Sequence, residues 1–222
     1  MSTKVLTFDR GAYEVDGEFG YGTRSEDDIR ESGVNIDHNW GFPIPNLPFH
    51  PTSQDIAHVR SLLPLPPELV TQILDLAEYW AYFQRKRSDA GQFRNANERY
   101  IQSVPILGGD FVRPLRRLVV TTDSRDQGWS SYPEDHGTRQ NSWTWFELTL
   151  DDGETNREIM RVEVVRNIHA KPVFERKETV IEDEKLLSLA KMGDRLSVWA
   201  RAMYPGWCNN VRSVEIEAWV AY

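Results

Sequence analysis

The segment from residue 214 to residue 220 alternates strictly between two kinds of side chain. Apolar residues occupy every second position, and charged residues or tryptophan occupy the positions between them. A period of two is typical of a β-strand with one face in a core and the other face outside it. The apolar side consists of Val214, Ile216, Ala218 and Val220, and the other side of Glu215, Glu217 and Trp219.

Shorter segments with the same character come before it in the last half of the chain. Each is rich in β-branched or aromatic residues, and turn-forming residues lie between them. The segments are 118–122, 143–150, 160–165, 178–181 and 195–202. Short strands in this pattern predict a mainly β protein, an antiparallel β-sandwich of the jelly-roll kind. The plan is similar to that of galactose-binding-like modules, which carry ligand loops at one rim.

Residues 16–111 differ in composition from the rest of the chain. Prolines between 41 and 48 remove backbone donors, so this stretch is expected to lie extended as a strap across a hydrophobic surface. Helical spacing then predicts a helix over about 66–84, as an insertion or cap. We expect a single core over 1–222. Its sandwich is expected to comprise 1–15 and 112–222.

The charge balance limits the partners. The 222 residues include 34 acidic and 26 basic side chains, for a formal net charge of -8. Nucleic acid and anionic lipid both require a concentrated positive face, so neither is expected as a partner. The lone Cys208 cannot form an internal disulfide, and the first residues lack the apolar run of a signal peptide. A cytoplasmic or nuclear location is therefore expected.

The densest polar and aromatic segment is a predicted loop over 122–137, and a second one, 201–210, leads into the last strand. Loops at one end of an antiparallel sandwich come together, and functional groups concentrate in such loops. The candidate ligand-binding residues are Arg125, Asp126, Trp129, His136, Trp143, Trp145, Arg201 and Trp207. In the alternative interpretation, the polar side chains only satisfy the backbone of an ordered loop.

The sequence shows little of the residue patterns that are typical of catalytic or metal-binding sites. The five histidines show no zinc-ligand spacing, and the chain has neither a phosphate-binding Gly-Lys-Ser/Thr loop nor a Gly-x-Ser-x-Gly elbow. We therefore expect no cofactor and no metal. If the protein is an enzyme, His136 and Asp126 are the candidate acid and base.

The predicted helix has a broad apolar face. Leu69, Ile73 and Trp80 recur on it at helical spacing and are the candidate partner-binding residues. The segment 65–74, with the sequence LPPELVTQIL, resembles the opening helix of an F-box, the short motif that docks onto an adaptor subunit of ubiquitin ligases. The resemblance implies a protein partner. In the alternative interpretation, the same face packs on the sandwich.

A combination of motifs in the last half of the chain resembles a group of proteins from filamentous fungi. The motifs are SRDQGWS at 124–130, SWTWF at 142–146, NIHA at 167–170, GDR at 193–195 and ARAMYPGW at 200–207. No function comes with this group, so the resemblance implies a fungal source and a shared architecture only.

These observations leave three hypotheses for the function. The first is a non-catalytic binding module that holds a small polar ligand, a glycan or a peptide at the tryptophan-rich rim. The second is an F-box-like adaptor that docks a partner through the helix over 66–84. The third is a cofactor-independent enzyme, such as an isomerase or cyclase of fungal small-molecule metabolism, which requires a closed pocket with His136 or an acidic residue pointing inward.

Overall fold

The computed structural model describes residues 50–107 and 114–221, and before them only the backbone of four short strands. The chain divides into two compact units, Met1–Phe49 and His50–Tyr222, where a single core over 1–222 was expected. The strands of the first unit form two antiparallel pairs. They are β1 (Tyr13–Val15) with β2 (Glu18–Gly20), and β3 (Asn35–Asp37) with β4 (Phe42–Ile44). The remainder of the predicted strap over 41–48, and its contacts, lie outside the described residues.

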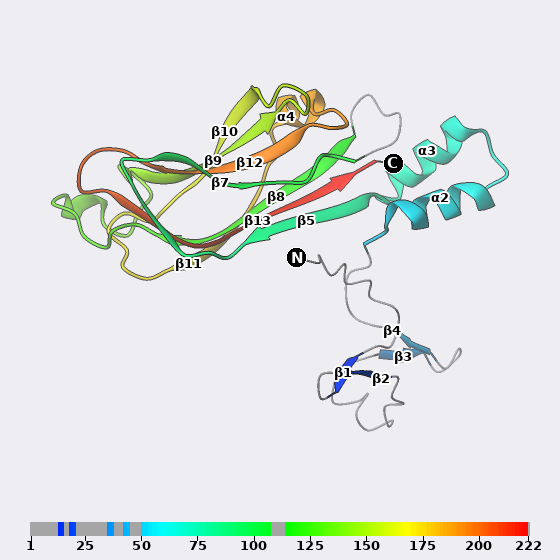
Figure 1. The fold of residues 1–222 in the computed structure, drawn as a ribbon, viewed down its shortest axis with the longest axis horizontal. Coiled ribbons are helices and arrows are strands. Elements are labelled where there is room, and N and C mark those ends of the chain that lie inside the picture. Colours follow the sequence, from blue (N-terminus) through cyan, green and yellow to red (C-terminus); the bar gives the residue numbers. More distant parts are fainter. Residues whose placement is uncertain are drawn as a thin grey trace. The chain divides into compact units, whose positions relative to one another are not determined.

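The second unit is a sandwich of two antiparallel sheets (Figure 1). One sheet has the order β10 (Glu158–Arg166), β9 (Thr144–Asp151), β12 (Arg195–Ala202) and β7 (Asn97–Gln102). The other has the order β11 (Glu175–Val180), β8 (Leu115–Arg125), β13 (Cys208–Val220) and β5 (Ala81–Arg87), and β6 (Gly91–Arg94) also pairs with β13. The mainly β, antiparallel sandwich predicted from the sequence is confirmed.

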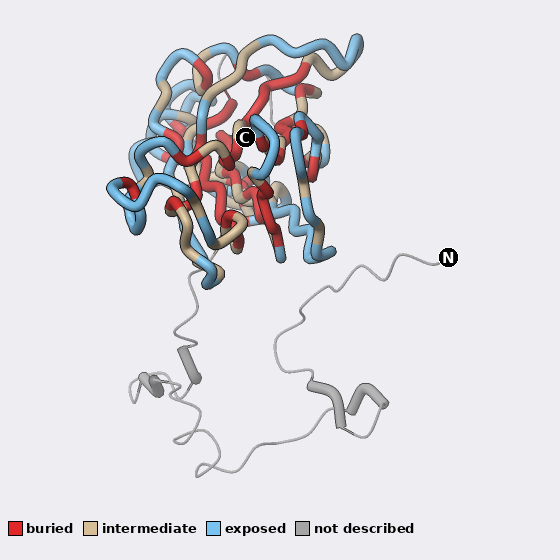
Figure 2. The backbone as a smooth tube through the Cα atoms, turned by 90° about the vertical axis from the view of Figure 1, so that its left-hand side faces the viewer, coloured by how far each residue is buried: buried red, intermediate tan, exposed pale blue. Residues whose placement is uncertain are grey.

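Alternating side chains from the two sheets form the core. On β9, Phe146, Leu148 and Leu150 are fully buried, and on β13 so are Val214 and Ile216. Figure 2 shows buried segments in the interior of this unit, with exposed segments around them. The alternation over 214–220 therefore marks the face of β13 that packs against the other sheet.

Strands β5, β6 and β7 extend the sandwich beyond the boundary predicted at residue 112. β5 pairs with β13, and β7 pairs with β12. On the core-facing side of β5, Ala81 and Phe83 are followed by Arg85 and Arg87, which lie opposite the buried Val214 and Ile216. Charges that point inward on an edge strand discourage pairing with another chain. They also remove the apolar alternation by which a strand is recognised in a sequence.

Two helices come before β5. They are α2 (Ser53–Leu62) and α3 (Pro67–Leu76), and they pack on the core through Ile56, Val70 and Leu74. A shorter helix, α4 (Glu184–Leu189), lies in the connection between β11 and β12, and a 3-10 turn, η1 (Pro133–Asp135), lies between β8 and β9. Within the described ranges, no helix is both long and apolar enough to cross a membrane.

Helix α3 ends eight residues before the predicted end at 84. Glu78 adopts a left-handed conformation with φ 51°, and the N–H groups of Glu78 and Tyr79 donate back to carbonyls of the last turn. This arrangement is a Schellman termination. Trp80 therefore lies beyond the helix and leads into β5. The predicted helix over 66–84 is wrong at its C-terminal end, because the helical spacing that reaches Trp80 continues across this stop.

Asp75 joins α3 to the sandwich. Its Oδ1 accepts hydrogen bonds from Arg116 Nε on β8 and from the indole of Trp80, both at 2.8 Å. Burial raises the pKa of Asp75, but the hydrogen bonds from Arg116 and Trp80 and the guanidinium charge outweigh burial and hold the pKa below its ordinary value of 3.8. A carboxyl group with a depressed folded pKa stabilises the fold above its unfolded pKa. That stability is lost as the pH falls through the folded pKa.

We predict that Asp75→Asn lowers the free energy of unfolding at pH 7 by about 1 kcal/mol, because solvent screens a pair that is only partly buried. The difference between the variant and the parent should shrink as the pH falls from 7 to below the lowered pKa of Asp75, where the parent loses the same charge. Urea unfolding at both pH values measures it. A difference that does not change with pH would show that the charge of Asp75 does not contribute to the attachment of α3 to the sandwich.

Candidate functional site

The loops at one end of the sandwich form its rim, at the end away from α2 and α3 (Figure 1). β8 starts near α3, where Arg116 meets Asp75, and ends at Arg125. The loop 126–143 follows it, loop 167–174 follows β10, and loop 203–207 precedes β13. The two tryptophan-containing loops meet, since the backbone N–H of Cys208 donates to Gln127 Oε1 at 3.3 Å.

Asp126 fastens three segments of the rim. Its side chain is fully buried, and its two oxygens accept hydrogen bonds from Gly128 N at 2.8 Å and from Ala170 N at 2.7 Å. Its backbone carbonyl accepts a hydrogen bond from Asn210 Nδ2 at 2.9 Å. Burial raises the pKa of Asp126, although these backbone donors and the nearby His169 oppose it. Asp126 therefore holds the loops and does not face a ligand.

His169 fastens the neighbouring turn. Its imidazole is fully buried, and Nδ1 lies 3.1 Å from the carbonyl oxygen of Gln140, so this nitrogen carries the proton. The backbone of His169 exchanges hydrogen bonds with Gly137 and Thr138, at 3.1 and 2.7 Å. The rim is thus built from loops that are tied to one another by buried polar groups.

A hollow of about 320 Å³ opens beside these loops and is called the rim hollow below. Its floor is the outer side of three paired strands, where Cys208 lies opposite Arg94 and Asn210 lies between Gln92 and Arg125. Its wall includes the indole of Trp129, which is 61% exposed. The described lining residues are Gln92, Arg94, Arg125, Gln127, Trp129, Gly206, Cys208 and Asn210.

The charge of the rim hollow is positive. Arg94 and Arg125 contribute guanidinium groups, and no carboxylate occurs among the described lining residues. Arg125 donates to the carbonyl of Asp126 at 3.3 Å and lies over the ring of Phe174 at 5.1 Å. Arg94 has no ion pair in the part of the chain that the structure describes. The thiol of Cys208 is buried and lies 3.8 Å from Asn210 Oδ1.

Other predicted ligand residues lie near the rim hollow but do not line it. His136 is exposed, and its Nε2 lies 3.3 Å from the carbonyl oxygen of Ser130. The ring of His169 lies between His136 and Trp207, with centroid distances of 5.7 and 5.0 Å. Trp143 packs edge-on against Tyr204 at 4.8 Å. Within the described residues no contact joins His136 to Asp126, so the two do not form an acid and base pair.

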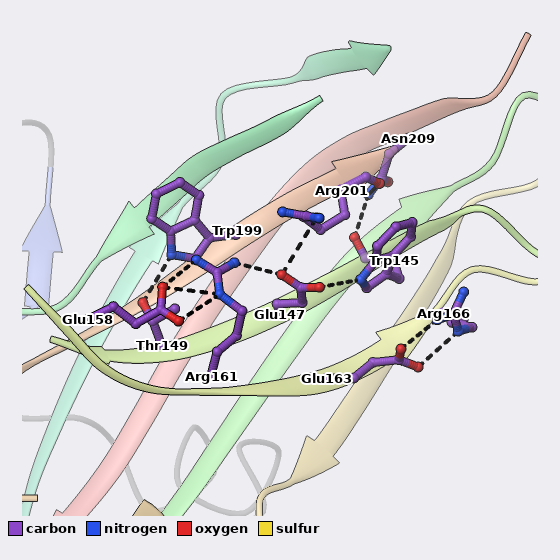
Figure 3. A network of polar contacts seen from close by, with 10 residues as sticks. All are labelled: Trp145, Glu147, Thr149, Glu158, Arg161, Glu163, Arg166, Trp199, Arg201 and Asn209. Carbon is purple, nitrogen blue, oxygen red and sulfur yellow. Dashed lines mark hydrogen bonds and ion pairs between the residues drawn. The ribbon is translucent and has the colours of Figure 1, made fainter. Parts of the chain in front are cut away.

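Trp145 and Arg201 lie on the outer face of the other sheet, in a set of contacts called the outer-face network (Figure 3). The guanidinium groups of Arg166 and Arg201 lie over the Trp145 ring, at 5.0 and 5.3 Å from its centroid. Its indole N–H donates to Glu147 at 2.8 Å. With arginines stacked on its ring and 6% exposure, Trp145 is not available to stack on a ligand.

Carboxylates neutralise most of the arginines of this network (Figure 3). Arg161 reaches Glu147 and Glu158, each at 2.6 Å, and Arg166 reaches Glu163 at 2.6 Å. Period-two alternation along β9 and β12 places Trp145 and Arg201 on this face. The prediction that they belong to the rim followed only from their position next to the loops.

Sequence reasoning missed most of the floor of the rim hollow. Gln92 and Arg94 are on β6, a four-residue polar strand that carries no recognisable pattern. Asn210 was inside the second predicted loop, but it belongs to β13. The one sequence signal that points to Asn210 is the alternation of 214–220, continued toward the start of the strand. The register shift between Val211 and Ser213 interrupts this alternation.

Two buried asparagines connect the sheets beneath the rim. Asn167 Nδ2 donates to Asn209 Oδ1 at 2.9 Å, and Asn209 Nδ2 donates to the carbonyls of Trp145 and Arg201 at 3.1 and 3.2 Å. Ser124 on β8 donates to Asn167 Oδ1 at 2.7 Å. Buried amides with partners on both sheets fix the position of the loop ends.

Comparisons with known proteins identify no family. No family model matches the chain, and no curated protein matches it. A structure of Maize Chlorotic Mottle Virus obtained by single-particle analysis contains a similar chain, at 12% identity and a TM-score of 0.25, with 64% of this chain and 92% of that chain covered. The function therefore rests on the geometry of the site.

We predict that Asn209→Ala lowers the free energy of unfolding by about 3 kcal/mol, because it removes the acceptor of one Asn167 N–H group and a donor to two backbone carbonyls in the interior. Asn97→Ala, an exposed asparagine on β7, is the matched control and should change it by less than about 0.5 kcal/mol. Chemical denaturation measures both. Equal losses in the two variants would contradict the structural role of Asn209.

Proposed function

We propose that the protein is a non-catalytic binding module that holds a small polar ligand in the rim hollow. One observation carries the proposal. An exposed indole, Trp129, borders a floor that presents two arginines and several amide groups, and no acid occurs among its described lining residues. The lone cysteine and the acidic composition support a cytoplasmic or nuclear place for this binding.

The lining favours a ligand with one ring and one acidic group. An indole face packs against a sugar ring or a flat apolar group. Guanidinium groups bind carboxylate or phosphate oxygens in pairs, and Gln92, Gln127 and Asn210 offer amide donors and acceptors beside them. A volume of about 320 Å³ is at the small end for ligand sites. An acidic sugar unit of a glycan, or an acidic residue of a peptide, matches this lining.

Buried polar groups hold the loops around the rim hollow in place. Asp126 and His169 are fully buried and tie loop 126–143 to loop 167–174 and to β13. A site that does not have to order its loops on binding avoids part of the entropy cost of association. This supports specific binding by a small ligand with few contacts.

The third prediction is tested by measuring Tm in the presence of acidic sugars, neutral sugars, dicarboxylates and acidic dipeptides. A compound that binds only the folded protein raises Tm. We expect an acidic compound to raise the Tm of the parent, and Trp129→Ala and Arg94→Gln each to weaken its binding about tenfold or more. Tyr132→Ala is the matched control, since Tyr132 is a 58% exposed aromatic residue on the same loop that does not line the hollow.

Two outcomes contradict this proposal. The first is a Tm shift that Trp129→Ala retains in full, because the ligand then binds elsewhere. The second is a panel in which neutral compounds bind as well as acidic ones, because the arginines then have no role. Asp126→Ala is not a suitable probe, since it removes a buried tie between loops and not a ligand contact.

The enzyme hypothesis has less support in this geometry. His136 and Asp126 do not line the rim hollow, and the oxygens of Asp126 are occupied by backbone donors. Chemical turnover of a compound found by the Tm panel would favour an enzyme over a binding module.

A second proposal is that α3 docks a protein partner, as the F-box resemblance implies. Leu69 and Ile73 are 47% and 45% exposed, while Val70 and Leu74 on the same helix are buried. Trp80, the third predicted partner residue, is not on this face, because it lies beyond the helix and bonds to Asp75. The other exposed leucines of this surface are Leu62, Leu65 and Leu76.

The fourth prediction tests this second proposal with the purified F-box-docking adaptor subunit of a fungal ubiquitin ligase. We expect the two proteins to elute as one complex from gel filtration, and the Leu69→Gln, Ile73→Gln double variant to lose the complex. Leu189→Gln on α4 removes a leucine that is 36% exposed and should leave the complex intact. Separate elution of the parent and the adaptor would rule out the proposal.

A further inference from the structure

A second hollow opens at one edge of the sandwich, and none of its lining residues belongs to the rim hollow. Edge strands β5 and β7 of the two sheets approach each other there, and Arg87 donates to the carbonyl of Tyr100 at 2.6 Å. The volume is about 590 Å³, and this hollow is called the edge site below. Its described lining residues are Arg85, Lys86, Arg87, Asp89, Arg195 and the segment 100–105.

The edge site is strongly positive, although the chain as a whole carries a net charge of -8. Arg85, Lys86, Arg87 and Arg195 line it, against Asp89 as the one acidic residue of the described lining. These cations come from both sheets, since Arg195 is the first residue of β12. Opposite sides of the hollow therefore present positive charge to the same space.

The register of β5 directs two of these arginines inward. Arg85 lies opposite Ile216, and Arg87 lies opposite Val214, and both partners are fully buried on the core-facing side of β13. Residues that lie directly opposite in an antiparallel pair share one face of the sheet. Arg85 and Arg87 thus extend from the edge strand over the gap between the sheets.

Internal partners neutralise this charge only in part. Arg87 pairs with Asp89 at 3.2 Å. Lys86, on the other face of β5, lies 3.8 Å from Glu215 of β13. Arg195 donates one hydrogen bond, to the carbonyl of Ser103 at 3.3 Å. Arg85 has no ion pair within the described residues. A guanidinium group has five donors, so Arg85 and Arg195 retain most of theirs for a ligand.

We propose that the edge site binds a small polyphosphate, a ligand with two or three linked phosphate groups. Arginine forks match pairs of phosphate oxygens, and the three arginines of the site surround a space large enough for such a chain. The aromatic residue of the site is not available for stacking, because Tyr100 is buried and Arg87 lies over its ring at 4.5 Å. Recognition here is by charge, whereas the rim hollow offers an indole to a ring.

Calorimetric titration of the whole chain with inorganic tripolyphosphate tests this proposal. We expect binding of one tripolyphosphate per chain that weakens with added salt, as expected for a partly exposed charged site. Arg85→Gln should weaken it about tenfold, and the Arg85→Gln, Arg195→Gln double variant should weaken it further. Arg85 is exposed, so its replacement leaves the core unchanged. Circular dichroism confirms that each variant is folded.

Two controls distinguish binding at the edge site from nonspecific electrostatic attraction to the protein surface. The Lys177→Gln, Lys185→Gln variant also removes two positive charges, from β11 and α4, and neither residue lines the edge site, so it should bind within about twofold of the parent. Arg157→Gln removes one exposed positive charge that lines neither hollow and should likewise leave tripolyphosphate binding unchanged. Absent binding by the parent, or equal loss in a control, overturns the proposal. If citrate binds as tightly as tripolyphosphate, the edge site does not select phosphate groups, and that part of the proposal is overturned.

Discussion

Strand β13 determines which way the important side chains face, because β8, β5 and β6 all pair with it. Near its start, Asn210 faces the rim hollow while Asn209 points inward to the amide of Asn167. Farther along, the buried Val214 and Ile216 lie opposite arginines of β5. A slip of one residue in this register would exchange the two faces of the strand. The core, the rim and the edge therefore depend on one pattern of backbone pairing.

The same side chain, arginine, has two different roles in this fold. On the outer face of β9, β10 and β12, Arg161 and Arg166 lie close to carboxylates and stack on tryptophan rings. At the two hollows, Arg94 and Arg85 have no ion pair within the described residues. An unpaired charge is tolerated only where water or an anion solvates it. In the two proposals above, the unpaired arginines, and not the paired ones, are therefore the side chains that would meet a negatively charged ligand.

Sequence reasoning recovered the sandwich because its central strands, such as β9 and β13, alternate clearly over many residues. It missed β5 and β6. On β5, Arg85 occupies a core-facing position where an apolar residue would be expected, and edge strands tolerate such charges. On β6, which carries Arg94, the four residues form no recognisable pattern. It placed Trp145 at the rim, although the period of two assigns this residue to the outer face. It found Arg125 and Trp129, which lie in the rim hollow. The partners of these residues on β6 come from a distant segment, so no local pattern in the sequence brings them together.

Asp126 shows why the residue types of a loop do not reveal their role. A carboxylate beside Trp129 suits a ligand contact, yet this one is fully buried and accepts hydrogen bonds from Gly128 and Ala170. Burial raises its pKa, so keeping the carboxylate ionised costs free energy, which the backbone donors and His169 partly offset. In return, the loop that carries Trp129 is fixed to its neighbour. A large indole can then remain exposed at the rim without collapsing onto the sandwich, and the proposed binding at the rim hollow depends on this fixed exposure.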